Sequence, residues 1–310
     1  MTITQPDQLR VRAARNGNLV VFGANGFAFA TWMSRVPDVK DVLALTPGNL
    51  SILLLAVSAG SVFGLPLAGR IASRIGAGAT ARLGMGLALP GIVFASVAVQ
   101  AQTTIFLVMP GLFLLGMGSG IWDVAQNLEG TIVERALDKA IMPWFHAAFS
   151  GGTVAAALVG AGMTWLQVPI PVHLAAAAVA CAAAGWWGTR QFLPAFDDAP
   201  TGATSTGRAR SAWLEPRTLL IGLMVLAAAF AEGTANDWMA VAFVDGHELD
   251  NALGVVALAV FLSFMTAGRI LGTGLLNRYG RVLVLRAMFA AAVLGCLLVV
   301  FGNPVAAFIG

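Results

Sequence analysis

Hydrophobic residues come in long blocks along this chain, each separated from the next by a short polar segment. Nine blocks are 18–36, 49–69, 79–100, 105–131, 143–166, 170–190, 218–241, 252–272 and 282–302, and a tenth begins at Pro304. A helix needs about 20 apolar residues to cross a hydrocarbon layer of about 30 Å. Barrel strands would show short alternating runs instead, and helices satisfy their own backbone in lipid. The pattern therefore predicts an all-α polytopic membrane protein with nine to ten helices.

The basic residues alternate between the two sides that this map defines. The odd-numbered segments, starting with the N-terminal tail, hold 16 of the Lys and Arg residues, with Arg269 assigned to the segment after the eighth span. The even-numbered segments hold only 2, Arg35 and Lys40. Cytoplasmic loops carry such an excess. We therefore expect a multi-pass protein of the cytoplasmic (inner) membrane with its N-terminus in the cytoplasm.

Composition agrees with a membrane protein and narrows the chemistry. The chain is 58% hydrophobic and 11% charged, whereas soluble domains carry about 25% charged residues. Its formal net charge of +3 reflects the sidedness of the loops and gives no reason to expect nucleic-acid binding. Cys181 and Cys296 both fall inside predicted spans, so neither a disulfide framework nor a metal site is expected. No cofactor is expected either.

An internal repeat divides the chain into two halves. ANGFAFATWM at 24–33 is similar to AEGTANDWM at 231–239, and GRIASRIGA at 69–77 is similar to GTGLLNRYGR at 272–281. The second pair shares a Gly followed by Arg-x-Gly, and its members are offset by 204 residues. Parallel repeats joined by a central cytoplasmic loop are typical of one class of secondary transporter. The predicted parts are a cytoplasmic tail (1–17), a six-helix bundle (18–190), a cytoplasmic linker (191–216) and a second, incomplete bundle (217–310).

Four stretches in the expected spans resemble a known family. They are TWMSRVPDVKDVLAL (31–45), GMGSGIWDVAQNLEG (116–130), MPWFHAAFSGG (142–152) and AEGTANDW (231–238). With the two Gly-rich loops, they make the chain similar to the major facilitator superfamily, and in particular to its bacterial fucose-permease-like branch. The resemblance implies two six-helix bundles related by a pseudo-two-fold axis, with a solute site between them. That family has twelve helices, so we expect the C-terminal helices to be missing.

The resemblance implies a gating role for the two loops, and this chain differs from the family in two respects. Gating loops are implied at Gly69, Arg74, Gly76, Arg278 and Gly280. The family usually has an acid before each of these Arg residues, where this chain has Ser73 and Asn277. Fucose permease has an aspartate in its first helix, where this chain offers Asn25. Fucose itself is therefore not expected to be the solute.

Polar residues inside the fourth and fifth spans are candidates for the solute and proton site. A charged side chain at the centre of a span costs about 2.5–3.5 kcal/mol on insertion scales, so such a residue usually faces a cavity or a partner. Asp123 and Asn127 lie four residues apart and share a helix face. The resemblance favours a cavity role for Asp123, because fucose permease has an acid at the matching position; the alternative is an interhelical hydrogen bond. His146 and Ser150 share a face in the next span, and His146 is either a proton relay or structural.

The first and seventh spans offer facing walls for the same cavity. The candidates are Asn25 and Trp32 in the first span and Glu232, Asn236, Asp237 and Trp238 in the seventh. Amides and acids beside indole rings suit a sugar-like solute, but the two Trp residues also suit an aromatic belt at the membrane interface. The cluster from Arg35 to Asp41, just after the first span, is predicted to be a local charged cap.

These observations predict a secondary active transporter that moves a small polar solute by alternating access, coupled to protons. The expected partners are the solute, protons and the lipid bilayer. The sequence has no nucleotide-binding loop and no Ser-His-Asp spacing, so an enzyme is not expected. Two alternatives remain open. One is efflux of amphiphilic compounds, and the other is a non-transporting membrane sensor or truncated fragment.

Overall fold

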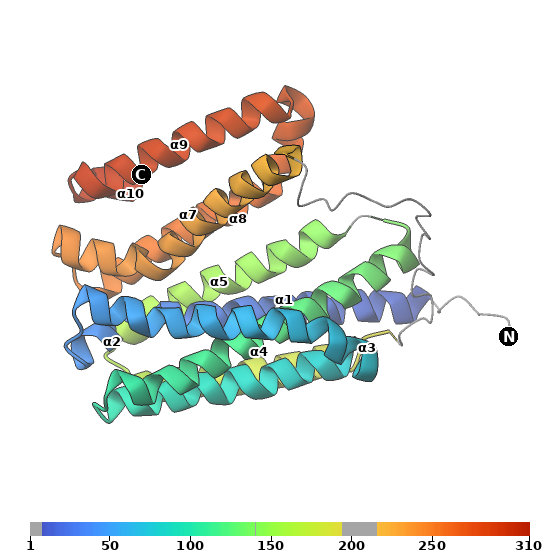
Figure 1. Ribbon diagram of the computed structural model, residues 1–310, viewed down its shortest axis with the longest axis horizontal. Coiled ribbons are helices and arrows are strands. Elements are labelled where there is room, and N and C mark those ends of the chain that lie inside the picture. The colour runs from blue at the N-terminus through green and yellow to red at the C-terminus, as the bar shows by residue number, and fades with distance from the viewer. Residues whose placement is uncertain (1–7, 140, 194–215) are drawn as a thin grey trace, which may run out of the picture.

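The computed structural model of the protein describes residues 8–139, 141–193 and 216–310, and these residues form helices joined by short connections (Figure 1). The helices are α1 (Gln8–Met33), α2 (Val36–Val42), α3 (Pro47–Gln100), α4 (Ile105–Leu137), α5 (Met142–Trp165), α6 (Ile170–Thr189), α7 (Pro216–His247), α8 (Asn251–Tyr279), α9 (Arg281–Phe301) and α10 (Pro304–Ile309). The described residues contain no strand. The predicted all-α polytopic fold is confirmed. Most of the predicted linker, 191–216, lies outside the described residues.

Seven of the described helices are long and apolar enough to cross a membrane by length and composition. One of them, α3, holds two of the predicted spans. The first helix, α1, is not among the seven, because Asn18, Asn25 and several glycines lower its mean hydropathy. It remains a predicted span.

The two predicted Gly-rich loops are each a single residue long. Helix α3 departs from helical geometry at Gly76, where φ is 79° and ψ is 162°, and Gly280 between α8 and α9 has a φ of 78° and a ψ of 157°. A positive φ is readily adopted by glycine and strains other residues. The predicted extent of the loops was wrong, because Gly69 and Arg74 lie inside α3 and Arg278 lies inside α8. Helices continue past the apolar block until a glycine turns the backbone, and they do so in the same way in both halves.

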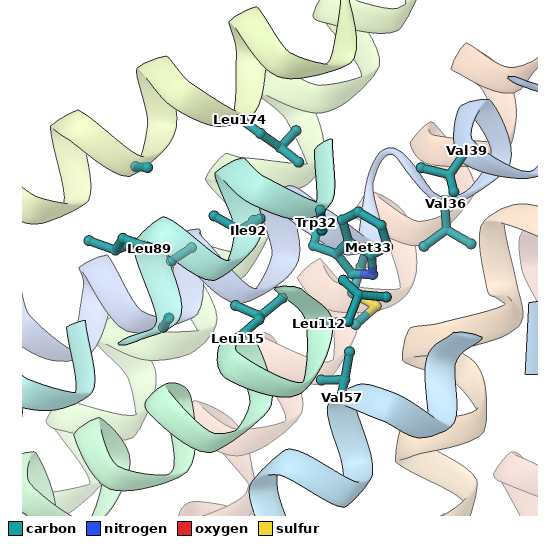
Figure 2. Close-up of a cluster of buried hydrophobic side chains, with 14 of the residues drawn as sticks. Trp32, Met33, Val36, Val39, Val57, Leu89, Ile92, Leu112, Leu115 and Leu174 are labelled. Carbon is teal, nitrogen blue, oxygen red and sulfur yellow. The ribbon is translucent and has the colours of Figure 1, made fainter. Parts of the chain in front are cut away.

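The largest apolar core includes residues of α1, α3, α4 and α6 and extends to α7 and α8. Trp32 lies at its centre, near Met33, Leu112 and Val57 (Figure 2). Small residues let these helices approach closely. A Cβ at Gly116 of α4 would overlap the backbone of Val57 in α3, which is how membrane helices gain contact without a hydrophobic driving force.

The C-terminal helices meet the N-terminal bundle mainly through α7 and α8. Helix α5 packs on α8, and the short helix α2 contacts both α7 and α8. Helices α9 and α10 lie on the far side of α7 and α8 from the N-terminal bundle (Figure 1). The residues between α5, α7 and α8 are therefore where the two halves can share a site.

Candidate functional site

Arg269 bonds to a polar side chain in each half, Glu232 in α7 and Ser150 in α5. Arg269 of α8 forms an ion pair with Glu232 of α7, with 2.7 Å between Nη2 and Oε1. The other terminal nitrogen of Arg269, Nη1, donates to the hydroxyl of Ser150 in α5 at 2.7 Å. Ser150 is fully buried, while the Arg269 and Glu232 side chains are 36% and 43% exposed. These bonds join the two halves, and the ion pair itself is partly exposed.

A small cavity of about 20 Å³ adjoins the ion pair. A cavity of this size holds roughly one water molecule. Its polar lining is Thr153, Glu232 and Asn236, and its apolar lining is Phe29, Ala30, Met33, Phe149, Leu258, Leu262 and Met265. Helices α1, α5, α7 and α8 all contribute. Two of the residues predicted on the seventh span, Glu232 and Asn236, thus face the junction of the halves.

Arg269 was missed by the sequence analysis, which counted it in a cytoplasmic segment. That assignment was wrong: Arg269 lies within the candidate membrane span Asn251–Gly272, three residues before its end. The signal was present in the sequence, because SFMTAGRILG places one Arg in an otherwise apolar run. A charge in such a run is expected to face a cavity or a partner. Without Arg269, the odd-numbered segments still hold most of the Lys and Arg residues, so the expected orientation is unchanged.

Asp123 lies in a second polar cluster, on α4. Its Oδ1 accepts a hydrogen bond from the Gln126 side chain at 3.0 Å, and the Asn127 amide donates to the Asp123 backbone oxygen at 2.9 Å. Both of these hydrogen bonds stay within α4. His146 of α5 is close enough for its charge to interact with Asp123. The structure therefore brings Asp123, Asn127 and His146 into one region, and their roles in transport remain predictions.

The other predicted residues lie farther from the ion pair or face elsewhere. Trp32 is fully buried in the core of the N-terminal bundle (Figure 2). Because Trp32 lines neither the cavity nor a membrane interface, we do not include it in the candidate site. Asn25 is buried in α1. Asp237 and Trp238 are half-buried, and they turn away from the cavity because successive helix residues point about 100° apart.

A network of charged and amide side chains joins the halves at the end of the bundle that carries α2. We call it the α2 network; its members are Arg35, Asp38, Lys40, Asp41, Asp245 and Asn251. Lys40 pairs with Asp245 of α7, with 2.6 Å between Nζ and Oδ1. The Asn251 amide of α8 donates to Asp38 Oδ1 at 3.0 Å and to Asp41 Oδ2 at 2.7 Å. The predicted local cap is thus also a link between the two halves.

Within the N-terminal half, Arg35 and Asp38 of the α2 network bond to each other and to residues after α2. The Arg35 guanidinium pairs with Asp38 through Nε at 2.8 Å and donates through Nη2 to the Val168 carbonyl at 2.6 Å. Thr164 donates to Asp38 Oδ2 at 2.9 Å. A vestibule of about 660 Å³ lies beside these residues. Arg35 and Asp38 therefore hold α2 against α5 and the α5–α6 connection, and α2 in turn holds α7 and α8.

Bundled helices with polar groups at mid-helix where two repeats meet define a polytopic membrane transporter. The chain belongs to the Major Facilitator Superfamily, whose family model matches residues 19–310. It is similar to the transporter y4wD of Sinorhizobium fredii, with 34% identity over 91% of this chain and 73% of that protein. It is also similar to an MFS-type transporter of Yersinia pestis, with 28% identity over 94% of this chain and 73% of the other.

A solved structure shares the fold. The nucleoside transporter NupG superposes with a TM-score of 0.72 at 13% identity, covering 96% of this chain and 77% of NupG. At this identity the likeness concerns the fold alone. The family predicted from the sequence is confirmed by these matches.

Proposed function

We propose that the protein is a secondary active transporter of the cytoplasmic membrane that carries a small polar solute and is coupled to protons. The observation that supports this most is the set of bonds joining Ser150, Arg269 and Glu232. These bonds join an ion pair of the C-terminal half to a buried hydroxyl of the N-terminal half, within candidate membrane spans. Such groups mark substrate or ion pathways in membrane proteins. The basic excess of alternate segments supports a cytoplasmic N-terminus.

The cavity beside the ion pair suits a solute with both hydroxyl groups and an apolar face. Glu232, Asn236 and Thr153 offer hydrogen-bonding groups, while Phe29 and Phe149 offer flat apolar surfaces. A sugar or a nucleoside has this combination of surfaces, and the fold neighbour NupG is a nucleoside transporter. The solute enters as the bundles move apart, since the space between them is small in this state.

We assign proton coupling to the carboxylates at mid-helix. Asp123 lies near the middle of α4 and Glu232 near the middle of α7. A carboxylate that faces opposite sides of the membrane in turn can load a proton on one side and release it on the other. His146, near Asp123, carries an imidazole that can accept and donate a proton, so it can relay that proton.

A second candidate function is efflux of amphiphilic compounds. The apolar lining of the cavity, which includes two Phe and two Met side chains, favours this candidate. Met-rich surfaces adapt to ligands of different shape. The two candidates differ in solute and in direction, so one experiment separates them.

The test is solute-driven proton movement in vesicles containing the purified protein. The panel consists of sugars, sugar acids, nucleosides and amphiphilic dyes, applied with a pH gradient of either direction. Uptake of a sugar-like solute with a proton supports the proposal, and dye extrusion alone supports efflux instead. Glu232→Gln should reduce transport, while Glu248→Gln, an exposed acid just after α7, should not. A wild-type protein that moves no member of the panel would reject both functions.

A further inference from the structure

We infer that Arg269 recognises a carboxylate on the transported solute, and that Glu232 occupies the same guanidinium while the site is empty. This inference rests on the proposed transport function and narrows its solute to small organic acids. It comes from the contacts of Arg269 in α8.

The guanidinium of Arg269 is only partly used by its neighbours. Glu232 contacts it through one oxygen, Oε1, on one nitrogen, Nη2, and Ser150 accepts from Nη1. An Arg side chain has five N–H donors in a planar fork that matches both oxygens of a carboxylate. Two-point pairing of this kind is stronger and more specific than the single contact that Glu232 makes. A solute carboxylate can therefore compete for Arg269.

The position of Arg269 indicates a function beyond structure. It lies within the apolar run SFMTAGRILG, three residues before the end of the candidate membrane span Asn251–Gly272. The side chain is 36% exposed, so a solute can reach it. A permanently charged group at this depth needs a counter-charge, and Glu232 supplies it in the empty site. The pair is thus electrically neutral without solute.

The cavity next to the ion pair can accept the Glu232 side chain when a solute displaces it from Arg269. Glu232 lines this cavity and is itself 43% exposed. Its displaced carboxylate can be hydrated there or take up a proton. Either way Arg269 keeps a counter-charge, because the solute anion replaces Glu232 as its partner.

The contact with Ser150 ties recognition to the movement of the bundles. Ser150 is on α5 of the N-terminal half, and Arg269 is on α8 of the other half. A carboxylate that binds the guanidinium through both terminal nitrogens competes with this bond. Solute binding therefore loosens one of the links between the halves.

The experiment uses pairs of solutes that differ only in the acid. Vesicles with the full chain are given D-glucuronate or D-glucose, D-gluconate or D-sorbitol, and nicotinate or nicotinamide. The inference expects uptake of one or more acids without their neutral partners. Arg269→Gln should reduce that uptake by about tenfold or more, because the bidentate partner is lost. Arg269→Lys should restore only part of it, since an ammonium offers no fork.

Arg286→Gln is the matched control, because Arg286 is an exposed residue on the next helix, α9. Arg269→Gln alone leaves Glu232 without its counter-charge, which can lower folding yield. The double variant Arg269→Gln with Glu232→Gln removes both charges together, and its elution profile in detergent reports whether it folds.

Each outcome decides the inference. Acid-selective uptake that is lost in the folded double variant supports it, provided that Glu232→Gln alone keeps its preference for the acid over the neutral partner. Acid uptake that persists in the double variant overturns the inference. Uptake of the neutral solutes alone, unchanged by Arg269→Gln, also overturns it. Either result leaves the proposed transport function intact. If the wild-type protein moves none of the wider vesicle panel, the transport function fails, and the inference fails with it.

Discussion

Lys40 and Asp245 lie 205 residues apart in the chain and form an ion pair with 2.6 Å between Nζ and Oδ1. Lys40 belongs to α2 in the N-terminal half, and Asp245 is near the end of α7 in the other half. With the two hydrogen bonds from Asn251, this pair closes the end of the bundle that carries α2. A transporter that alternates between two open ends has to break these bonds once in every cycle.

We therefore expect a short cross-link between positions 40 and 245 to stop transport. The protein should be prepared with Lys40→Cys and Asp245→Cys after Cys181 and Cys296 have been changed to Ser, since both are free thiols. Cross-linking with a short reducible bismaleimide analogue should abolish solute uptake, and reduction should restore it. Each single Cys variant, treated in the same way, is the control. Full uptake by the cross-linked protein would show that this end does not open.

Gly76 should resist substitution more than Gly69 of the same helix. Gly76 has a φ of 79°, and an L side chain there is strained by roughly 1–2 kcal/mol. Gly69 lies inside α3 with open space where a Cβ would be, so Ala should stabilise the helix there by about 1 kcal/mol. Gly76→Ala should lower the midpoint of thermal unfolding in detergent, and Gly69→Ala should leave it equal or higher. Equal midpoints for the two variants would contradict the argument.

Gly280, the counterpart of Gly76 in the second half of the repeat, allows an independent test of the same prediction. Gly280 has nearly the same φ and ψ as Gly76, so Gly280→Ala should lower the unfolding midpoint by a similar amount. A much smaller effect would mean that the two breaks are not equivalent.

Glu134 caps the start of α5 from the neighbouring helix. Its Oε1 accepts from the backbone nitrogens of Ile141 and Met142 at 2.7 and 2.8 Å. A carboxylate at a helix N-terminus stabilises both the unpaired N–H groups and the helix dipole. We expect Glu134→Ala to reduce stability by about 1–3 kcal/mol and to speed hydrogen exchange of these two amides. Arg135→Ala, at an exposed neighbour, should leave exchange unchanged.

Asp123→Asn tests the predicted role of that carboxylate in proton coupling. If Asp123 carries the proton, the variant should lose uptake driven by a pH gradient by at least about tenfold and keep the exchange of labelled for unlabelled solute. Exchange needs no net proton movement, so it survives loss of the titrating group. Asp138→Asn, at an exposed residue after α4, is the matched control. Gradient-driven uptake at the wild-type rate would assign coupling to another acid.

Most of the fold could be predicted because membrane helices leave a strong local signal. The nine apolar blocks map onto eight helices, with α3 holding two of them. The ends of the helices were predicted less well: α3 runs to Gly76 and beyond, where a loop from 69 was expected. A polar residue such as Arg70 or Ser73 can leave the hydrocarbon and remain helical, so polarity alone does not mark where a helix ends.

The candidate site was predicted only in part. Glu232, Asn236 and Ser150 were chosen for their helix faces, and the structure places all three at the junction of the halves. Trp32 was chosen by the same rule and lies in the core instead. Arg269 was lost because a count of basic residues assigned it to a loop. Helix periodicity says which residues share a face, and it does not say what that face meets.

The sequence alone determined that this chain is a bundle of membrane helices, that it repeats after about 200 residues, and that it resembles its family. These properties follow from local composition and from similarity along the chain. Only the tertiary structure decided that Arg269 meets Glu232 and Ser150, and that Lys40 meets Asp245. Such partners are set by the rotation and neighbours of each helix, which depend on side-chain contacts between segments 37 to 205 residues apart.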